Sequence, residues 1–577
     1  MATLADAKLG SLAQAAFRRL KTMLAEGGSI PSAEAEVALA ALLETMEAAL
    51  ERRLLPRFYL SSIDPGMGKS RGVLAFLLEF VRRGGEPDNG ILVCLATWDE
   101  VKRMIDAAGL PACSFGVLTS NDKLNAMGRS VAKAAPILFT THQMVARRRG
   151  LPEAFHYCGK PRALKIWDEG MMPAEPVVIS RDNLGSLLPC RLHAPKLVDL
   201  VDDLLPKLNE AKFGSSIRLE PELVDAAAAA SSHPLIETRL RNLLRDLGSV
   251  ADQPLLVVDD GGTGKAFAGI RERLPPDFAP AVILDASGRV SGVYSLWGEY
   301  RRDLVRLPSA ANDYGDVHVN IWRRRNGREA YAPGPDRKEL LDAIADLINE
   351  DGESQWLIFH YLFDEAFGAE LRSLVDANAE ERVHTLAWGS HRATNEYRHI
   401  PNVVVTGQLT YRRSAYLASA MAASGLPARR VLELDLVPFA NAEFAAHLQQ
   451  AIGRSTVRQS RNGKAGAARV YAVLSPKQPP SKAVEAALPG ARIGTWKERE
   501  LPLRGQPAKA YHYVVERLSD GSAREVAKGE VSRAIGVTKS SNFARNVMRH
   551  PAFLAALERA GIVVRHRHFE RVKPEPD

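Results

Sequence analysis

Residues 58–80 read FYLSSIDPGMGKSRGVLAFLLEF: an apolar run, a glycine-containing turn and a second apolar stretch with helical periodicity. This order predicts a buried strand that passes through a tight turn into the start of a helix, a backbone arrangement that binds phosphate groups. Gly66 and Gly68 let backbone N–H groups approach phosphate oxygens without interference from a Cβ atom. The stretch therefore predicts a phosphate-binding loop.

Two side chains of this loop carry the predicted chemistry. Lys69 offers a positive charge to the β- and γ-phosphates, and the hydroxyl of Ser70 is a ligand for Mg²⁺. The position six residues before the lysine, usually Gly or Ala, is Ile63. The competing interpretation is a glycine-rich turn that happens to precede a lysine. The predicted nucleotide-binding residues are Asp64, Pro65, Gly66, Met67, Gly68, Lys69 and Ser70.

An acidic pair follows a second apolar run, LKIW at 164–167. Two adjacent carboxylates at the tip of a buried strand are costly unless they serve an ion or a reaction. We expect Asp168 to hold Mg²⁺ and Glu169 to orient and deprotonate an attacking water. A solvated acidic pair at a strand end is the alternative.

A third motif, QAIGRSTVR at 450–458, follows a helical stretch. Phosphoryl transfer needs a cation opposite the phosphate loop, and an arginine from a second domain supplies it only when the site closes. Gln450, Arg454 and Arg458 are therefore predicted catalytic residues, with Arg454 the preferred arginine finger. The alternative is a basic loop after an amphipathic helix.

Short apolar runs alternate with helical stretches from residue 57 onward, which predicts an α/β fold with parallel sheets. In the second half, the predicted strands are WLIFHYLF (356–363), PNVVVTG (401–407), RVLELDLV (430–437) and ARVYAVL (468–474). In the lysine-containing turn at 260–266 the lysine is followed by Ala266, which cannot bind a metal, so this turn is predicted to be a hairpin or loop. The predicted parts are an N-terminal helical segment (1–55), a first α/β domain (56–300) with a helical insertion at about 181–250, a second α/β domain (301–478), a linker (479–510) and a C-terminal domain (511–577).

Composition is compatible with this assignment. The 577 residues carry a net charge of +8 and a pI of about 9.2, which suits a polyanionic partner. No apolar run of about 18 residues is present, so we expect no contact with a membrane, and without a secretory signal we expect a cytoplasmic protein. The cysteines are scattered, and we predict reduced, buried thiols rather than metal ligands.

The three motifs together resemble those of the superfamily 2 helicases and translocases, in the broad DEAD/DEAH-box sense. Residues 64–70 resemble motif I, residues 168–170 motif II and residues 450–458 motif VI, with one extra residue before the last arginine. The resemblance implies two tandem RecA-like domains that bind ATP and Mg²⁺. Gly170 stands where the family usually has Ala, and no adenine-reading glutamine precedes Ile63.

The resemblance also implies roles for residues between the main motifs. Nucleic-acid contacts are implied at Thr97 (motif Ia), at Thr141 and His142, and at Gly389 and Asn395 (motif V). A lone histidine at a strand end is more often a structural residue, so both interpretations of His142 stay open. Residues that would couple hydrolysis to movement are implied at motif III: Asp285, Ala286 and Ser287.

The last part of the chain holds much of the excess positive charge, with sixteen Lys/Arg against ten Asp/Glu from Trp496 to the end. Residues 523–549 resemble a helix-turn-helix with Gly536 at the turn, and a basic strand pair follows, which predicts a winged-helix-like domain. Lys539, Arg545 and Arg549 are its predicted nucleic-acid contacts, with DNA favoured over RNA. A small helical domain with a solvated basic face is the alternative.

Three functions remain open from the sequence. The first is a nucleic-acid-dependent ATPase that translocates on or unwinds DNA. The second is a packaging-type motor whose second half is a nuclease that uses Asp259, Asp260 and Asp285. The third is a DNA-binding regulator that uses nucleotide only as a switch, against which Glu169 argues because a switch has little need for a positioned base.

Overall fold

The chain forms two compact units, residues 1–496 and 497–577. Within the described residues, no helix combines the length and the apolar character that a membrane-spanning segment requires. The computed structural model describes residues 10–85, 88–250, 253–261, 264–376, 378–389, 396–407, 409–475, 480–496, 505–519, 524–550, 553–554, 556–557 and 560–571.

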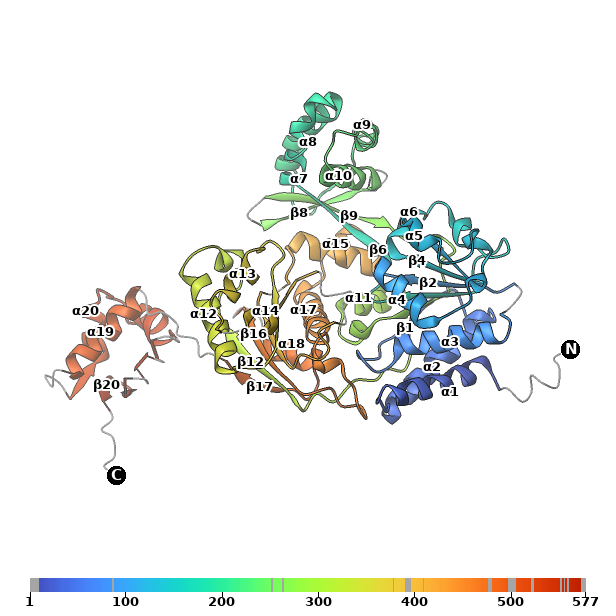
Figure 1. Ribbon diagram of the computed structural model, residues 1–577. Coiled ribbons are helices and arrows are strands. Elements are labelled where there is room, and N and C mark those ends of the chain that lie inside the picture. The colour runs from blue at the N-terminus through green and yellow to red at the C-terminus, as the bar shows by residue number, and fades with distance from the viewer. Residues whose placement is uncertain are drawn as a thin grey trace. The chain divides into compact units, whose positions relative to one another are not determined.

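The first domain is built on a parallel sheet with the strand order β11-β1-β10-β5-β2-β4-β3 (Figure 1). Strands such as β1 and β2 are buried along their whole length, as expected for a parallel sheet with helices on both faces. The strands are β1 (Phe58–Ser61), β2 (Ile91–Leu95), β3 (Phe115–Leu118), β4 (Ile137–Thr141), β5 (Leu164–Asp168), β10 (Ala281–Leu284) and β11 (Leu304–Arg306). The helices include α3 (Lys69–Arg82), α4 (Trp98–Ala108), α5 (Asp122–Asn125), α6 (His142–Arg147) and α11 (Gly292–Leu296).

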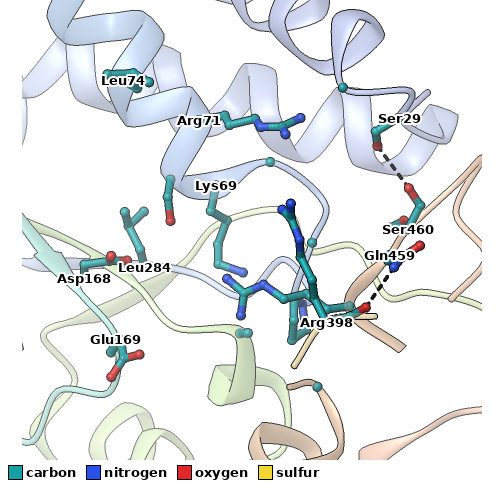
Figure 2. Close-up of a pocket in the computed structure, with 18 of the residues that line it drawn as sticks. Ser29, Lys69, Arg71, Leu74, Asp168, Glu169, Leu284, Arg398, Gln459 and Ser460 are labelled. Atoms are coloured by element: carbon teal, nitrogen blue, oxygen red, sulfur yellow. Dashed lines mark hydrogen bonds between the residues drawn. The ribbon is translucent and has the colours of Figure 1, made fainter. Parts of the chain in front are cut away.

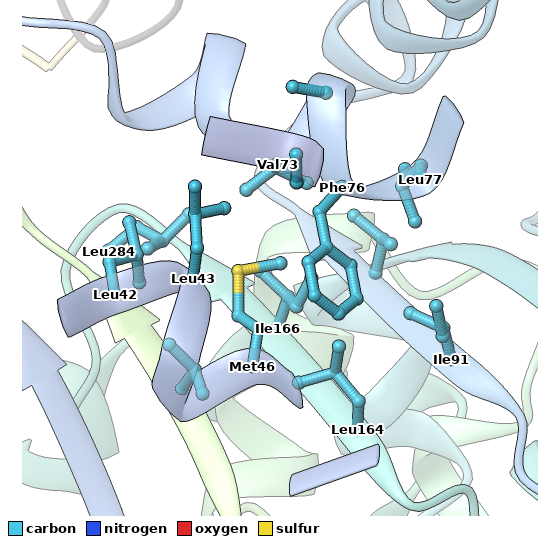
Figure 3. Packing of buried hydrophobic residues seen from close by; sticks show 14 of the residues in the cluster. Leu42, Leu43, Met46, Val73, Phe76, Leu77, Ile91, Leu164, Ile166 and Leu284 are labelled. Carbon is cyan, nitrogen blue, oxygen red and sulfur yellow. The ribbon is translucent and has the colours of Figure 1, made fainter. Parts of the chain in front are cut away.

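The predicted N-terminal helical segment forms two helices, α1 (Leu12–Glu26) and α2 (Ala33–Leu50), and the side chain of Ser32 caps α2. These helices are part of the first domain's core. Figure 3 shows Leu43 and Met46 of α2 beside Phe76 of α3, above the strands. Because the apolar faces of α1 and α2 cover α3, the loop between them is held beside the phosphate-binding loop.

The second domain is also built on a parallel sheet, with the order β14-β13-β15-β16-β12-β17. The predicted α/β class with tandem RecA-like domains is confirmed. The strands are β12 (Val317–Arg323), β13 (Trp356–His360), β14 (Val383–Ala387), β15 (Asn402–Val405), β16 (Ala468–Leu474) and β17 (Arg492–Thr495). The helices include α12 (Pro335–Glu350), α13 (Phe367–Arg372), α14 (Ala379–Arg382), α15 (Arg413–Ser424), α16 (Ala428–Val431), α17 (Leu436–Ile452) and α18 (Pro480–Ala487).

Two sequence predictions for this domain are wrong. Residues 430–437 are not a strand: they contain the end of α16 and the start of α17, whose N-terminus is capped by the side chain of Asp435. Pro438 fits the first turn of a helix but would interrupt a central strand. The range 479–510 is not simply a linker, because it contains α18 and β17, and β17 pairs with β12 as an exposed edge strand.

Between β5 and β10 the chain forms an inserted module. It carries the helices predicted over 181–250 and, in addition, an antiparallel sheet with the order β6-β9-β8-β7. The turn between β8 and β9 is the predicted hairpin. The strands are β6 (Ala174–Ser180), β7 (Ser216–Ile217), β8 (Leu255–Asp259) and β9 (Lys265–Glu272), and the helices are α7 (Arg181–Gly185), α8 (Pro195–Glu210), α9 (Pro221–Ser231) and α10 (Thr238–Ser249).

The inserted sheet packs against the second domain, although its sequence is an insertion in the first domain. Leu255 and Val257 face the module's own helices, whereas Leu256 and Val258 pack against α15. Figure 1 shows α15 beside the inserted sheet. Burial on both faces explains why β8 has the continuous apolar sequence of a parallel strand while it pairs antiparallel. At the hairpin, Asp260 accepts hydrogen bonds from Arg412 and from Ser414 at the start of α15.

The second unit has its own apolar core and an antiparallel sheet with the order β18-β20-β19. Gly536, with φ of 74°, lies between α20 and α21 as expected for the turn. Val531 and Phe543, from the helices on either side of this turn, are both buried. The elements are α19 (Gly505–Ser519), β18 (Glu525–Ala527), α20 (Lys528–Ala534), α21 (Ser540–Phe543), β19 (Ile562–Val564) and β20 (His568–Arg571).

Candidate functional site

The loop between β1 and α3 has the predicted strand–turn–helix context. Gly66 has φ of 84° and Gly68, the N-cap residue of α3, has φ of 108°, a conformation that L side chains rarely adopt. A Cβ atom on Gly66 would lie only 1.8 Å from the carbonyl oxygen of Arg458. Glycine is therefore required at position 66 both by the backbone conformation and by the close approach of the second domain.

The side chain of Lys69 folds back over the loop. Its Nζ donates hydrogen bonds to the carbonyl oxygens of Ile63 and Asp64. Burial lowers the pKa of Lys69 to about 8, against the opposing effect of Asp64 and Asp168. The hydroxyl-bearing Ser70 lines the same cavity and is exposed to it.

Asp64 is fully buried and joins the loop to the second domain. Its carboxylate accepts hydrogen bonds from the hydroxyl of Tyr314 at 2.6 Å, from the backbone N–H of Asn312 at 3.0 Å and from Nε2 of Gln449 at 2.9 Å. The sequence placed Asp64 in the nucleotide-binding loop, and the structure gives it these anchoring contacts. Buried carboxylates need such donors, because an unpaired buried charge is strongly destabilising.

The acidic pair lies at the end of β5, beside β10. Burial raises the pKa of Asp168 to about 6 and that of Glu169 to about 8, and in each the charge of Glu100 is the next contribution. Glu169 adopts φ of 74°, and its N–H donates to the carbonyl oxygen of Leu284 at 2.9 Å. A non-glycine residue in the left-handed region is uncommon, and such residues are frequent at functional sites.

Residues 450–458 of the second domain approach the acidic pair of the first domain. Nη2 of Arg454 lies 3.7 Å from Oε1 of Glu169. Nε2 of Gln450 donates to the hydroxyl of Ser287 at 3.3 Å. Residues 450–458 therefore contact Glu169 of the acidic pair and Ser287 of motif III, both in the first domain.

Between the two domains is a cavity of about 760 Å³. Figure 2 shows Lys69 between two ends of it, with Asp168 and Glu169 on one side and Ser29, Gln459 and Ser460 on the other. Cationic side chains outnumber acidic ones along the wall, which suits a polyphosphate. The cationic residues are Lys69, Arg71, Arg103, Arg398, Arg454, Arg458 and Arg461, and the acidic ones are Glu100, Asp168, Glu169 and Asp285.

Sequence reasoning missed several of these residues. Arg71, Arg103 and Arg398 are single arginines without a local pattern, and only the packing of distant elements brings them to the cavity. The loop at Gly27–Ser29 lies within the predicted N-terminal helical segment, for which no role in the site was predicted, yet it forms part of the wall. The two adjacent glycines were a signal for a close approach, but not for its partner.

The residues between the main motifs have varied surroundings. Thr97 and Thr141 are the N-cap residues of α4 and α6, with their hydroxyls accepting from backbone N–H groups. His142 is buried and stacks on Trp167 with ring centroids 3.9 Å apart. The expected nucleic-acid contact of His142 is therefore not supported, because its ring is enclosed by the first domain.

Motif III, at residues 285–287, is part of a hydrogen-bond network. Asp285 accepts from the N–H and the hydroxyl of Ser287 and from the hydroxyl of Tyr294, which in turn accepts from the N–H of Met171. Ala286 lines the cavity. Gly389 is exposed after β14 with φ of 100°. Asn395 lies outside the described residues.

The acids of the nuclease hypothesis do not share a site. Asp259 and Asp260 lie in the inserted hairpin, where Asp259 is exposed and Asp260 accepts hydrogen bonds from Arg412 and Ser414. Asp285 is enclosed in the first domain. In the described part of the chain, no group of three or more His, Cys, Asp or Glu side chains is arranged to hold a metal ion. The prediction of buried thiols holds for Cys94 and Cys190, but Cys113 and Cys158 are exposed.

Comparisons with known proteins concern the fold. No family model matches the chain, and no curated protein matches it. An apo XPD structure matches with a TM-score of 0.48 and 13% identity over 79% of this chain and 99% of that one. S. cerevisiae Dbp5 bound to RNA and ADP BeF3 matches with a TM-score of 0.37 and 12% identity over 82% and 95%. Mycobacterium smegmatis helicase Lhr bound to ssDNA and AMP-PNP matches with 0.35 and 13% over 98% and 61%.

The chain's own geometry defines the fold more directly. A phosphate-type loop in one parallel-sheet domain faces a glycine–arginine segment of a second such domain across a shared cavity. The chain therefore has two tandem RecA-like α/β domains that share one cavity. Because a fold does not determine activity, the function has to be derived from the residues of the cavity.

In the C-terminal unit, Lys539, Arg545 and Arg549 are all exposed. Lys539 lies just before α21, and the two arginines lie in and just after the helical turn that continues from it. All three are therefore within a short stretch that follows the glycine turn. Their exposure leaves them accessible to a polyanion.

Proposed function

We propose that the chain is a nucleic-acid-dependent ATPase of the helicase or translocase type, in which hydrolysis between two RecA-like domains drives movement on DNA or its unwinding. The observation that carries the proposal is the 3.7 Å approach of Arg454 in the second domain to Glu169 in the first, beside Lys69. An arginine supplied by the opposite domain makes phosphoryl transfer depend on domain closure. Closure then alternates with nucleotide state.

In this proposal Glu169 accepts a proton from the water that attacks the γ-phosphorus, and the bond to the ADP oxygen breaks. Burial raises the pKa of Glu169, and the neighbouring charge of Arg454 opposes this effect and favours the ionised form that accepts the proton. Lys69 and Arg454 neutralise the charge that develops on the transferred group. Arg458, whose carbonyl contacts the loop at Gly66, adds a second cation at the same wall.

The donor set fits Mg²⁺. The hydroxyl of Ser70 and the carboxylate of Asp168 are hard oxygen ligands, and both line the cavity. When bound, the ion would neutralise the β- and γ-phosphate oxygens.

Coupling to movement would run through the contact between Gln450 and Ser287. This hydrogen bond joins residues 450–458 of the second domain to the hydrogen-bond network around Asp285 in the first domain. If hydrolysis weakens the grip of Arg454, Gln450 and Ser287 separate and the domains part. Domains that each hold a nucleic-acid strand would then step along it.

DNA is the proposed partner. The exposed Lys539, Arg545 and Arg549 follow the glycine turn between α20 and α21, and together with the strands β19 and β20 this stretch would form a winged-helix-like DNA-binding domain. Of the fold neighbours, the Lhr structure holds ssDNA and the Dbp5 structure holds RNA, so both nucleic acids belong in the test.

The decisive assay is ATP turnover with and without single-stranded DNA, and with single-stranded RNA, for the wild type and Lys69→Ala. We expect strong stimulation by DNA in the wild type and its loss in the variant. Equal, low turnover in every sample would contradict the motor and favour a nucleotide switch. In that case Glu169→Gln would leave the slow rate unchanged, whereas for an ATPase it should lower kcat by about 10²–10⁴-fold.

A further inference from the structure

The base of the nucleotide needs a recognition element, and the cavity offers one at the end opposite Glu169. Figure 2 shows Gln459 there, next to Ser460 and Ser29 and across Lys69 from the acidic pair. The γ-phosphate end of the cavity is set by Glu169 and Arg454. A nucleotide whose phosphates follow the loop at 66–70 would therefore direct its base toward Gln459.

The carboxamide of Gln459 has a defined orientation. Its Nε2 donates a hydrogen bond to the backbone carbonyl oxygen of Arg398 at 2.8 Å. Because a carbonyl oxygen can only accept, the NH₂ group must point to it, and Oε1 must point elsewhere. Among the described residues, Oε1 of Gln459 accepts no hydrogen bond, and because Gln459 is exposed and lines the cavity, this acceptor is available to a ligand.

The neighbouring segments hold this end of the cavity together. The hydroxyl of Ser29 donates to the carbonyl oxygen of Ser460 at 3.0 Å, and the N–H of Asn462 donates to that of Ile30 at 2.8 Å. The N-terminal loop is thereby joined to the residues that follow Gln459. This wall combines segments of both domains, so a base bound here would contact both domains at once when they are closed.

Arg71 supplies a flat surface at the same end. A Cβ atom built on Gly27 would lie 2.7 Å from one guanidinium nitrogen of Arg71, so the guanidinium lies directly against the N-terminal loop. A guanidinium plane stacks well on an aromatic ring. Both Arg71 and Gly27 line the cavity.

We propose that Gln459 selects adenine: its Oε1 accepts a hydrogen bond from the exocyclic amino group of the base. The proposal rests on the proposed ATPase function and adds the residue that sets its base preference. Guanine and hypoxanthine carry a carbonyl oxygen at the same ring position, which would meet Oε1 as a second acceptor. A site that presents a fixed acceptor disfavours such a base, since the carbonyl cannot satisfy it.

The test compares ATP with ITP, which differ only in this ring position and the adjoining N1 proton. In the wild type we expect kcat/KM for ATP to exceed that for ITP by about tenfold or more, as one hydrogen bond and one repulsion predict. In Gln459→Leu we expect the ratio to fall to within about twofold, because ATP loses the hydrogen bond and ITP loses the repulsion. An unchanged ratio in the variant, or no preference in the wild type, would overturn the proposal.

Gln253→Leu is the matched control, because Gln253 also donates from Nε2 to a backbone carbonyl, that of Ile270, but in the inserted module. It should keep the wild-type ratio. Gln459→Asn keeps the amide and shortens its reach, so it should give an intermediate ratio even if the leucine variant folds poorly. Thermal denaturation of each variant reports folding.

Competition of ATP and ITP against a fluorescent nucleotide analogue measures base preference without hydrolysis. If the wild type binds but does not turn over, the ATPase proposal fails while the binding ratio still decides the role of Gln459. If Lys69→Ala abolishes turnover as expected and Gln459→Leu leaves the ATP/ITP binding ratio intact, only the inference about Gln459 fails.

Discussion

The guanidinium of Arg454 lies 3.7 Å from the carboxylate of Glu169, although Glu169 follows β5 of the first domain and Arg454 follows α17 of the second. The side chain of Arg454 is buried and that of Glu169 is 27% exposed, and burial lowers the pKa of Arg454 while it raises that of Glu169. Two groups that burial makes costly to ionise are thus held beside each other at the cavity. A triphosphate placed there would become a partner of the arginine.

Arg454→Ala should therefore lower kcat by about 10³-fold or more, because a finger arginine acts on charge that develops in the transition state. Nucleotide affinity should change by no more than several-fold. Single-turnover hydrolysis and nucleotide binding measure the two effects. Arg191→Ala, which removes an exposed ion pair of the inserted module, is the control and should leave both unchanged. If Arg454→Ala lost nucleotide binding and turnover in parallel, the arginine would act in binding the ground-state nucleotide and not in stabilising the transition state.

Asp260→Ala should destabilise the contact between the inserted module and α15. Asp260 is almost fully buried and accepts hydrogen bonds from Arg412 and Ser414, so its loss leaves two donors without their acceptor. We expect a decrease of about 1–3 kcal/mol in unfolding free energy. Urea denaturation and limited proteolysis of residues 174–272 would report it. The neighbouring, exposed Asp259 is the control: Asp259→Asn should behave as the wild type.

His142→Phe should remove part of the pH dependence of stability. Burial lowers the pKa of His142 from 6.5 to about 3, so the native state excludes a proton that the unfolded chain binds below pH 6.5. Stability from this residue is thus fully present above pH 6.5 and is lost as the pH falls toward 3. Thermal midpoints measured between pH 5 and 7.5 should fall less steeply in the variant, whose ring can still stack on Trp167. Parallel curves would show that His142 is protonated in the native state.

Replacing Lys539, Arg545 and Arg549 together with alanine should weaken DNA binding and reduce its salt dependence. Each phosphate contact adds about 0.9 to the slope of log K against log salt on duplex DNA, so loss of all three should reduce the slope by about 2–3. Fluorescence anisotropy at several salt concentrations measures it. Lys21→Ala, which removes an exposed pair with Glu36, should leave the slope unchanged. An unaltered slope in the triple variant would favour a solvated basic face.

Much of the fold could be predicted because its signals are local. Strand–loop–helix at 58–80, the acids after β5 and the segment 450–458 each carry their meaning within a few residues of chain. The strand predicted at 430–437 failed because its apolar residues belong to two short helices, which Pro438 and the cap at Asp435 favour. The continuous apolar run of β8 is explained by α15, which covers the second face of this antiparallel strand.

The sequence by itself determined the class of fold and the chemical groups available: a loop suited to phosphate, a pair of acids and an arginine motif. Only the tertiary structure decided which of these groups meet, because contacts such as Asp64 with Gln449 or Gln459 with Arg398 join residues far apart in the chain. It also enclosed His142 against Trp167, since burial depends on which elements pack over a residue. Local pattern fixes backbone conformation and side-chain type, whereas the position of one side chain relative to another is a property of packing.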